Sequence, residues 1–322
     1  MALVDYSSSG SESEPDTQPV KRRKAVDGSS RSTDGDSAAG ASSMPPLPDT
    51  FHDLYASTVR QSVVDDPSLH QGRKRHIPHV VGNWPSHVYT ECELSYMRPI
   101  ERTANSSGHP STEQHGLLTT LIADIEEHVS SDTKLFNFLT SDLGSPLPLH
   151  ISLSRPLSLT TSAKDEFLDK ITESFNSSGI APFTVKPQSL AWFRSPDSDR
   201  TFLILRVTSG PDTKPLNPEL TSLLLRSNSV AAQFGLPSLY ARSPDEPVGG
   251  AFHVSIGWTF HLPGDDMSVK TLQLFKQSKF DDIRKWEISV PGVKVKIGNV
   301  VNHIALKTGR SGAPKSTSFL KS

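Results

Sequence analysis

The pattern of apolar and polar residues predicts a mixture of strands and helices between residues 71 and 311. Strands are predicted where the two kinds of residue alternate, at 87–94, 149–154, 189–194, 201–208 and 252–258. A last series of strands is predicted to begin with 286–290 and to end with 302–307. Helices are predicted where apolar residues recur every three or four positions, at 115–129, 162–176, 217–233 and 267–277. For the second helix, Ser162 with Asp165 predicts an N-terminal cap and Gly179 predicts the end.

One arrangement of these elements occurs twice. A strand, a helix and a strand containing His-x-Ser follow one another at 87–154 and again at 201–258. The repetition predicts an α+β fold of two pseudo-symmetric lobes, each an antiparallel sheet with helices, with the active site in the cleft between the lobes. Chance alternation of elements in an α+β protein is the other explanation.

The two ends of the chain differ in composition from this middle part. Residues 1–70 are rich in Ser and Pro and are expected to be a disordered tail, because such a segment buries too little apolar surface to offset its ordering entropy. The segment 21–24, KRRK, is either a nuclear import signal or a solvated charge cluster. We expect one domain over 71–311 and a flexible C-terminal tail over 312–322.

Charge and cysteine usage exclude several classes of protein. With 33 basic and 35 acidic residues, the chain carries no global positive field that would attract nucleic acid or a membrane. The single cysteine, Cys92, excludes an internal disulfide and fits a reducing compartment. No secretory signal and no run of eighteen apolar residues occurs, so we expect a soluble, non-secreted monomer without a membrane partner.

His-x-Ser occurs four times, at 109–111, 128–130, 150–152 and 253–255. The first lies in polar sequence with Gly and Pro, and the second lies at the end of a predicted helix. The other two lie within predicted strands, where side chains alternate between faces. In both strands the histidine and the serine therefore share one face and the residue between them points into the core. These four residues are His150, Ser152, His253 and Ser255.

The chemistry of such a pair is that of acid–base catalysis at a phosphodiester. One imidazole can take a proton while a second gives one, and a neighbouring hydroxyl can hydrogen-bond a phosphoryl oxygen. The alternative is metal ligation by the two histidines, but neither has an Asp, Glu or Cys at ligand spacing. We therefore expect neither a metal nor another cofactor.

At these residues the sequence resembles the two-histidine (2H) phosphoesterase superfamily, and within it the U6 small nuclear RNA phosphodiesterase family. Five stretches in order carry the resemblance and span nearly all of 71–311. They are GNWPSHVY (82–89), LHISLSRP (149–156), RTFLILRVTSG (200–210), FHVSIGW (252–258) and KIGNVVNHIALK (296–307).

The resemblance implies a metal-independent 3′-to-5′ exoribonuclease that trims uridines from the 3′ end of U6 small nuclear RNA in the nucleus. The product carries a 2′,3′-cyclic phosphate, which some fungal members open to a 3′-phosphate. By analogy His150 deprotonates the attacking 2′-hydroxyl, His253 protonates the leaving 5′-oxygen, and Ser152 and Ser255 hold the non-bridging oxygens. The sequence itself does not decide which histidine is the base.

The resemblance also implies contacts with the single-stranded RNA 3′ end. Tyr240 matches a tyrosine that stacks on the terminal base, although the segment 243–250 makes its spacing to His253 longer than in the family. We count Ile151 and Val254, the central residues of the two motifs, as substrate-binding residues with Tyr240. The basic residues at 73–75 either touch upstream phosphates or form a solvated linker.

Two other functions remain open at this point. An enzyme of the same fold could act only on existing 2′,3′-cyclic phosphates and ignore RNA with a free 3′-hydroxyl. A catalytically inert RNA-binding module could keep the fold, although retention of both histidines and both serines argues against it.

Overall fold

The computed structural model describes residues 67, 72, 77, 80–95, 109–128, 134–141, 143–196, 198–210, 216–240 and 248–307. The chain divides into two units, Met1–Tyr55 and Ala56–Ser322, and every described residue belongs to the second. The basic segments 21–24 and 73–75, the C-terminal tail 312–322 and all of the predicted N-terminal tail except residue 67 lie outside the described residues.

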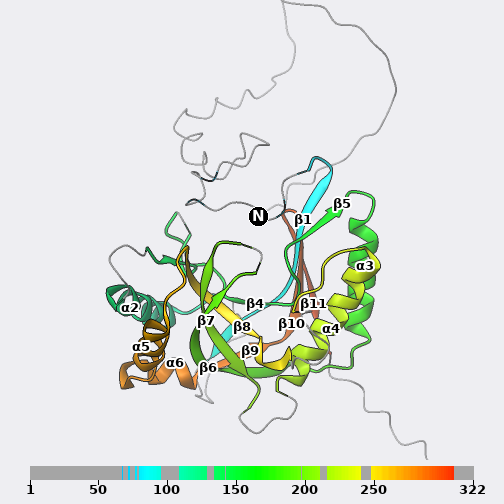
Figure 1. The fold of residues 1–322 in the computed structure, drawn as a ribbon. Coiled ribbons are helices and arrows are strands. Elements are labelled where there is room, and N and C mark those ends of the chain that lie inside the picture. The colour runs from blue at the N-terminus through cyan, green and yellow to red at the C-terminus, as the bar shows by residue number, and fades with distance from the viewer. Residues whose placement is uncertain are drawn as a thin grey trace, which may run out of the picture. The chain divides into compact units, whose positions relative to one another are not determined.

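An antiparallel sheet forms the centre of the described fold (Figure 1). Its strand order is β11-β10-β1-β4-β8-β7-β6-β9-β2, while β3 pairs with β8 and β5 with β1. The strands are β1 (Asn83–Glu91), β2 (Glu93–Ser95), β3 (Phe136–Asn137), β4 (His150–Ser152), β5 (Leu157–Thr160), β6 (Phe183–Arg194), β7 (Thr201–Thr208), β8 (His253–Thr259), β9 (Glu287–Val290), β10 (Gly292–Ile297) and β11 (Val300–Ala305).

Helices flank this sheet in two groups (Figure 1). One group packs near β6 and contains α2 (Thr112–His128), α5 (Asp265–Phe275) and α6 (Asp281–Lys285). The other contains α3 (Lys164–Asn176) and α4 (Pro218–Gln233), which pack on each other. Two 3₁₀ turns, η2 (Val248–Gly250) and η3 (Ser278–Phe280), complete the described elements.

The predicted duplication is visible in the strand order. The strands β10, β1 and β4 on one side of the centre mirror β6, β7 and β8 on the other, so a pseudo-twofold relation passes between β4 and β8. The helices are exchanged: α2, from the first repeat, packs against α5 and α6 beside β6, whereas α4, from the second, packs against α3. The α+β class and the antiparallel, pseudo-symmetric halves are confirmed.

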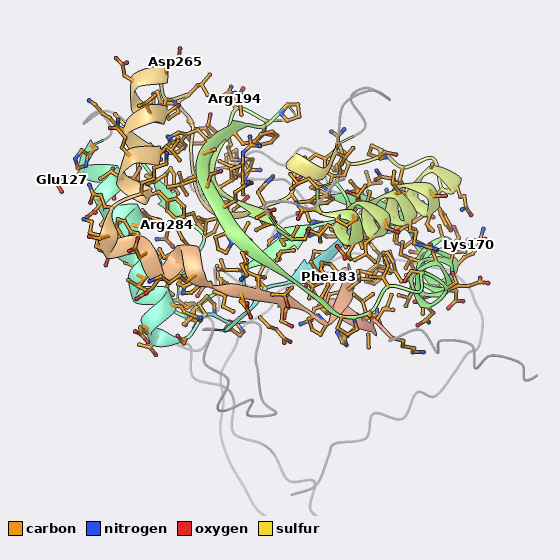
Figure 2. All side chains as sticks on the ribbon, turned by 90° about the horizontal axis from the view of Figure 1, so that it is seen from below. Glu127, Lys170, Phe183, Arg194, Asp265 and Arg284 are labelled. Atoms are coloured by element: carbon orange, nitrogen blue, oxygen red, sulfur yellow. The ribbon has the colours of Figure 1, made fainter. Side chains whose placement is uncertain are left out.

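The two halves of the fold meet within one continuous sheet. Strands β4 and β8 are hydrogen-bonded neighbours and join the two halves into one sheet. Its strands curve strongly, and Figure 2 shows β6 as a long bent strand running from Phe183 to Arg194. One face of the curved sheet packs against the hydrophobic core, and the other face carries the side chains of the candidate site.

Alternation within the strands separates these two faces. In β1 the side chains of Val88 and Thr90 are buried, whereas His87, Tyr89 and Glu91 are partly exposed. The buried set continues across the neighbouring strands and packs with apolar residues of α3, α4 and α5 in one core cluster. Apolar burial of this kind is the main favourable term in folding and holds the strands rigid under the polar face.

Most predicted elements are present, with shifted ends. Helix α3 begins at Lys164, and its N-cap residue, Ala163, makes no side-chain cap hydrogen bond. The predicted cap by Ser162 is therefore wrong, because the Ser162 hydroxyl is hydrogen-bonded to that of Thr160 instead. None of the described helices is long and apolar enough to cross a membrane.

Candidate active site

The two His-x-Ser motifs lie side by side on adjacent strands. Strand β4 holds the first motif, β8 holds the second, and their central residues, Ile151 and Val254, are paired. In an antiparallel pair the positions before and after this one must also oppose each other, so each histidine lies across from the serine of the other motif. The four candidate side chains therefore gather on one face of the sheet, as their alternation predicted.

The central residues themselves belong to the core. Ile151 is 0% exposed and Val254 is 2% exposed, and both pack in the core cluster. Counting them as substrate-binding residues is therefore wrong for their side chains, which point away from the polar face. Their contribution is to hold the two strands in register.

A third histidine, which the sequence analysis did not single out as a site residue, completes the first half of the site. The Nε2 atom of His87, on β1, lies 3.2 Å from the Oγ atom of Ser152. Its ring stacks on Tyr89 at 5.2 Å and meets the edge of His150 at 5.5 Å. Burial, together with the positive charge of His150, lowers the pKa of His87 to about 3, so this imidazole is neutral at physiological pH.

His150 lies at the surface of this cluster. Its ring contacts Tyr89 edge-on at 5.4 Å, and its neighbour across the strand pair is Glu91. The residue as a whole is exposed, yet the surrounding protein desolvates the imidazole enough to lower its pKa, while the negative charge of Glu91 raises it. Glu91 is itself paired with Lys294 of β10.

His253 has a different environment. Its Nδ1 atom lies 2.7 Å from the carbonyl oxygen of Ala251, which accepts a hydrogen bond, so Nδ1 carries the proton and Nε2 is the nitrogen available for proton transfer. Burial lowers the pKa of His253, the bond to Ala251 raises it, and the charges of Arg206 and His150 lower it again. Arg206 is directly opposite His253 in the β7–β8 pair and donates to the carbonyl of Gly250.

Tyr240 lies beside this second histidine. Its hydroxyl oxygen is 3.4 Å from Nδ1 of His253, and its ring packs edge-on against Phe252. Tyr240 has a φ of 56°, the left-handed region that is costly for a residue with a Cβ. The preceding residue, Leu239, is fixed by two hydrogen bonds to the side chain of Asn228 on α4. This loop therefore holds the tyrosine in place against the histidine.

The two serines are not equivalent. Ser152 is hydrogen-bonded to His87, whereas Ser255 has no side-chain hydrogen bond within the described part of the chain. A ligand on the polar face would thus meet one hydroxyl already oriented by the protein and one that is free to rotate.

The described residues contain no group of three or more His, Cys, Asp or Glu side chains that could hold a metal ion. Cys92 is buried, and burial raises the pKa of its thiol, so it is an inert core residue. The side chains gathered at the site are suited to proton transfer and anion binding.

Sequence reasoning missed His87, Glu91 and Arg206. For the first two a signal existed, because the alternation at 87–94 places them with Tyr89 on one face of a strand. Nothing local indicated that this face adjoins the first motif, since the β1–β4 pairing joins residues far apart in the sequence.

Comparison with known proteins identifies the family of the chain. The HVSL family, described as an uncharacterised conserved protein, matches residues 45–305. The chain is 37% identical to U6 snRNA phosphodiesterase 1 of Neurospora crassa in an alignment of 304 positions that covers 86% of this chain and 78% of the relative. It is 28% identical to the protein of the same name from Drosophila melanogaster, over 93% of this chain and 97% of the relative. The identity with the Homo sapiens protein of the same name is 27%, over 80% of this chain and 78% of the relative.

A solved structure, Kluyveromyces marxianus Usb1, aligns with 69% of this chain and 98% of its own, with a TM-score of 0.46 and 15% identity. At that level the structural likeness adds nothing to the sequence match.

Proposed function

Because the chain belongs to the HVSL family, together with the U6 snRNA phosphodiesterase 1 proteins, we propose that it is a metal-independent 3′-to-5′ exoribonuclease that trims the 3′ oligouridine end of U6 small nuclear RNA. The observation that carries this proposal is the pairing of the two His-x-Ser strands. It brings two imidazoles and two hydroxyls onto one face, where a single phosphodiester can contact all four.

The reaction needs one imidazole to take a proton and another to give one. The 2′-hydroxyl of the penultimate nucleotide loses its proton to the base, and its oxygen forms a bond to the adjacent phosphorus. The bond from phosphorus to the 5′-oxygen of the last nucleotide breaks, and the acid protonates that oxygen. The shortened RNA carries a 2′,3′-cyclic phosphate, and water can open it to a 3′-phosphate with the two roles exchanged.

Local charges support His253 as the base and His150 as the acid in the first step. Arg206 lowers the pKa of His253 and so favours its neutral, proton-accepting form. Glu91 raises the pKa of His150 and so favours its charged, proton-donating form. This assignment is the reverse of the one implied by the resemblance alone.

The serines bind the phosphoryl oxygens, and Ser255 is the better placed to donate. Its hydroxyl has no competing hydrogen bond within the described residues, whereas Ser152 is shared with His87. Hydrogen bonds that strengthen as charge develops on those oxygens stabilise the transition state. Tyr240, beside His253, stacks on the terminal base, which is worth about 1–3 kcal/mol for one base.

The same proposal covers the cellular setting. The chain acts as a monomer in the nucleus, without a cofactor or a membrane partner, and its substrate is the single-stranded RNA 3′ end. The catalytic domain extends over 71–311, with the tails at 1–70 and 312–322 outside it.

The test uses mass spectrometry of a short oligouridine with a free 3′-hydroxyl, incubated in EDTA with wild type, His150→Ala or His253→Ala. Wild type should shorten the RNA stepwise to cyclic phosphate or 3′-phosphate ends, and each variant should lose about 100-fold or more of the rate, as expected for loss of a general acid or base. His303→Ala, on the β11 edge strand, is the matched control and should retain activity. Activity lost in EDTA and restored by zinc or magnesium would refute the metal-free mechanism.

A second substrate tests the attacking group. RNA with a 2′-deoxy penultimate nucleotide should resist wild type completely, because it lacks the nucleophile. If that RNA were trimmed, water or a protein group would have to attack. Cleavage restricted to pre-formed cyclic phosphates would favour the cyclic-phosphodiesterase alternative, and full function of both alanine variants would favour a binding module.

A further inference from the structure

A row of aromatic side chains extends from the active site across four strands. Phe136 of β3 is paired with Trp258 of β8, Trp258 with Phe202 of β7, and Phe202 with Phe193 of β6. We refer to these four residues as the aromatic row. The rings of Phe136 and Trp258 stack with their centroids 4.3 Å apart.

The aromatic row lies on the polar face because β8 contains a bulge. Ser255 of β8 is paired with Ile204 of β7, and Gly257 of β8 is paired with Leu203 of β7. The residue between Ser255 and Gly257 therefore has no partner on β7. Such an insertion reverses the alternation of side chains along the strand. Trp258 is thereby turned to the face that carries His253, and the ring of Phe193 lies 5.6 Å from that imidazole.

Two cationic side chains lie over the row. The Lys134 ammonium is 4.8 Å from the centre of the Phe136 ring. The Arg200 guanidinium is 5.0 Å from the centre of Phe202 and 5.6 Å from that of Trp258. These contacts cover Trp258, which is 1% exposed, and place positive charge on the outer side of the rings.

An exposed ring continues the surface. Phe260, just past the end of β8, is 39% exposed and meets Trp258 edge-on at 5.0 Å. The neighbouring Arg194 and Asp199 are paired with each other. The surface therefore combines aromatic rings with the cationic groups of Lys134 and Arg200.

We propose that the aromatic row, with Lys134, Arg200 and Phe260, binds the RNA segment upstream of the scissile phosphate. The inference rests on the proposed function. When an exonuclease removes the last nucleotide, the bound RNA continues only on the 5′ side of the scissile phosphate. A protein surface that continues from the active site therefore contacts that 5′ segment. Cations suit the phosphates, and stacking on aromatic rings tolerates any base.

A second surface serves as the comparison. On the opposite side of the site, β10 carries Lys296, paired with His87 in the β1–β10 register. No aromatic ring stacks with this lysine among the described residues. Neutralising Lys296 removes a positive charge without touching the aromatic row, so Lys296→Gln is the control for loss of charge elsewhere beside the site.

The experiment compares an oligouridine octamer with diuridine as substrates. The ratio of their kcat/KM values is measured for wild type, for Lys134→Gln with Arg200→Gln, for Phe260→Ala and for Lys296→Gln. The double variant should lower the octamer-to-dimer ratio by about tenfold, and Phe260→Ala should lower it by a similar factor. The double variant should also flatten the salt dependence of octamer binding by roughly one counterion, and Lys296→Gln should leave the ratio at the wild-type value.

A binding measurement separates the inference from the proposed function. Fluorescence anisotropy measures the affinity of the same variants for a labelled octamer and does not depend on cleavage. If wild type cleaved neither RNA, only the proposed function would be refuted. An unchanged ratio and unchanged octamer affinity in the double variant and in Phe260→Ala, with thermal unfolding at the wild-type temperature, would overturn the inference. A loss confined to Lys296→Gln would overturn it as well and assign the upstream RNA to β10.

Discussion

At the scale of single residues, His87 determines the hydrogen bonding of Ser152 in the first motif. The hydrogen bond to the backbone of Ser154 raises the pKa of His87, but burial lowers it more. The imidazole is therefore neutral and carries a single N–H group. With that N–H given to the backbone, Nε2 accepts the proton of Ser152. This hydrogen bond positions the Ser152 hydroxyl at the site, and the hydroxyl must exchange Nε2 for a phosphoryl oxygen when the substrate binds, whereas the Ser255 hydroxyl can donate directly.

Replacing His87 should therefore affect turnover. We expect His87→Phe to lower kcat by about tenfold with a smaller effect on KM, because it removes the hydrogen bond that positions the Ser152 hydroxyl without removing a group that binds RNA. The glutamine variant, His87→Gln, keeps a hydrogen-bonding side chain and should recover part of the loss. Steady-state kinetics on oligouridine measures both, and equal kinetics for phenylalanine and wild type would exclude the positioning role.

The charges beside His150 and His253 give a prediction for the pH profile. Arg206→Gln raises the pKa of His253, and since the base must be neutral, the acidic limb of the bell-shaped profile should move to higher pH. Glu91→Gln lowers the pKa of His150, and since the acid must be charged, the basic limb should move to lower pH. The profile of kcat/KM measures both limbs. If Arg206→Gln instead moved the basic limb to higher pH, the two roles would be reversed.

At the scale of elements, one asparagine joins the second histidine to the scaffold. Asn217 precedes α4 with a φ of 50° and is 0% exposed. Its amide donates to the carbonyls of Val207 and Gly249 and accepts from the backbone of Ser209. These bonds tie the end of β7 and the start of α4 to η2, which is followed directly by Ala251, the hydrogen-bond partner of His253.

We expect Asn217→Ala to lower the free energy of unfolding by about 3 kcal/mol, because buried backbone groups lose their partners and alanine tolerates a positive φ poorly. Asn217→Gly is the control for the backbone: it removes the same hydrogen bonds but adopts the conformation freely, so it should cost less. Urea unfolding of the three proteins measures the difference. Equal stability of alanine variant and wild type would show that these hydrogen bonds contribute nothing net.

At the scale of the whole molecule, the exchanged helices and the joined sheet make the site depend on the complete fold. Each helix group covers strands of one half, and the site forms only where β4 meets β8. The polar face therefore collects three histidines, His87, His150 and His253, all with pKa values lowered by burial. The folded protein holds fewer protons on these groups than the unfolded chain does.

Stability should consequently fall in acid. For a histidine whose pKa is lowered in the folded state, the stabilisation is complete above the unfolded value near 6.5 and is lost as pH falls; for His87 the loss extends to about 3. One such group contributes at most about 1.4 kcal/mol per pH unit. Relative to wild type, His87→Phe should show a shallower decline of unfolding free energy between neutral and mildly acidic pH. Parallel curves from urea unfolding at several pH values would contradict this.

The sequence by itself determined the α+β composition, the repeated order of elements and the shared face of each His-x-Ser pair, because side-chain alternation is a local property of a strand. Only the tertiary structure decided that the two motifs pair as neighbours, that Glu91 and Arg206 adjoin different histidines, and that a bulge turns Trp258 toward the site. Those facts depend on which distant strands hydrogen-bond and in what register. That choice is made by the burial of the whole apolar face, which no short segment of the chain specifies.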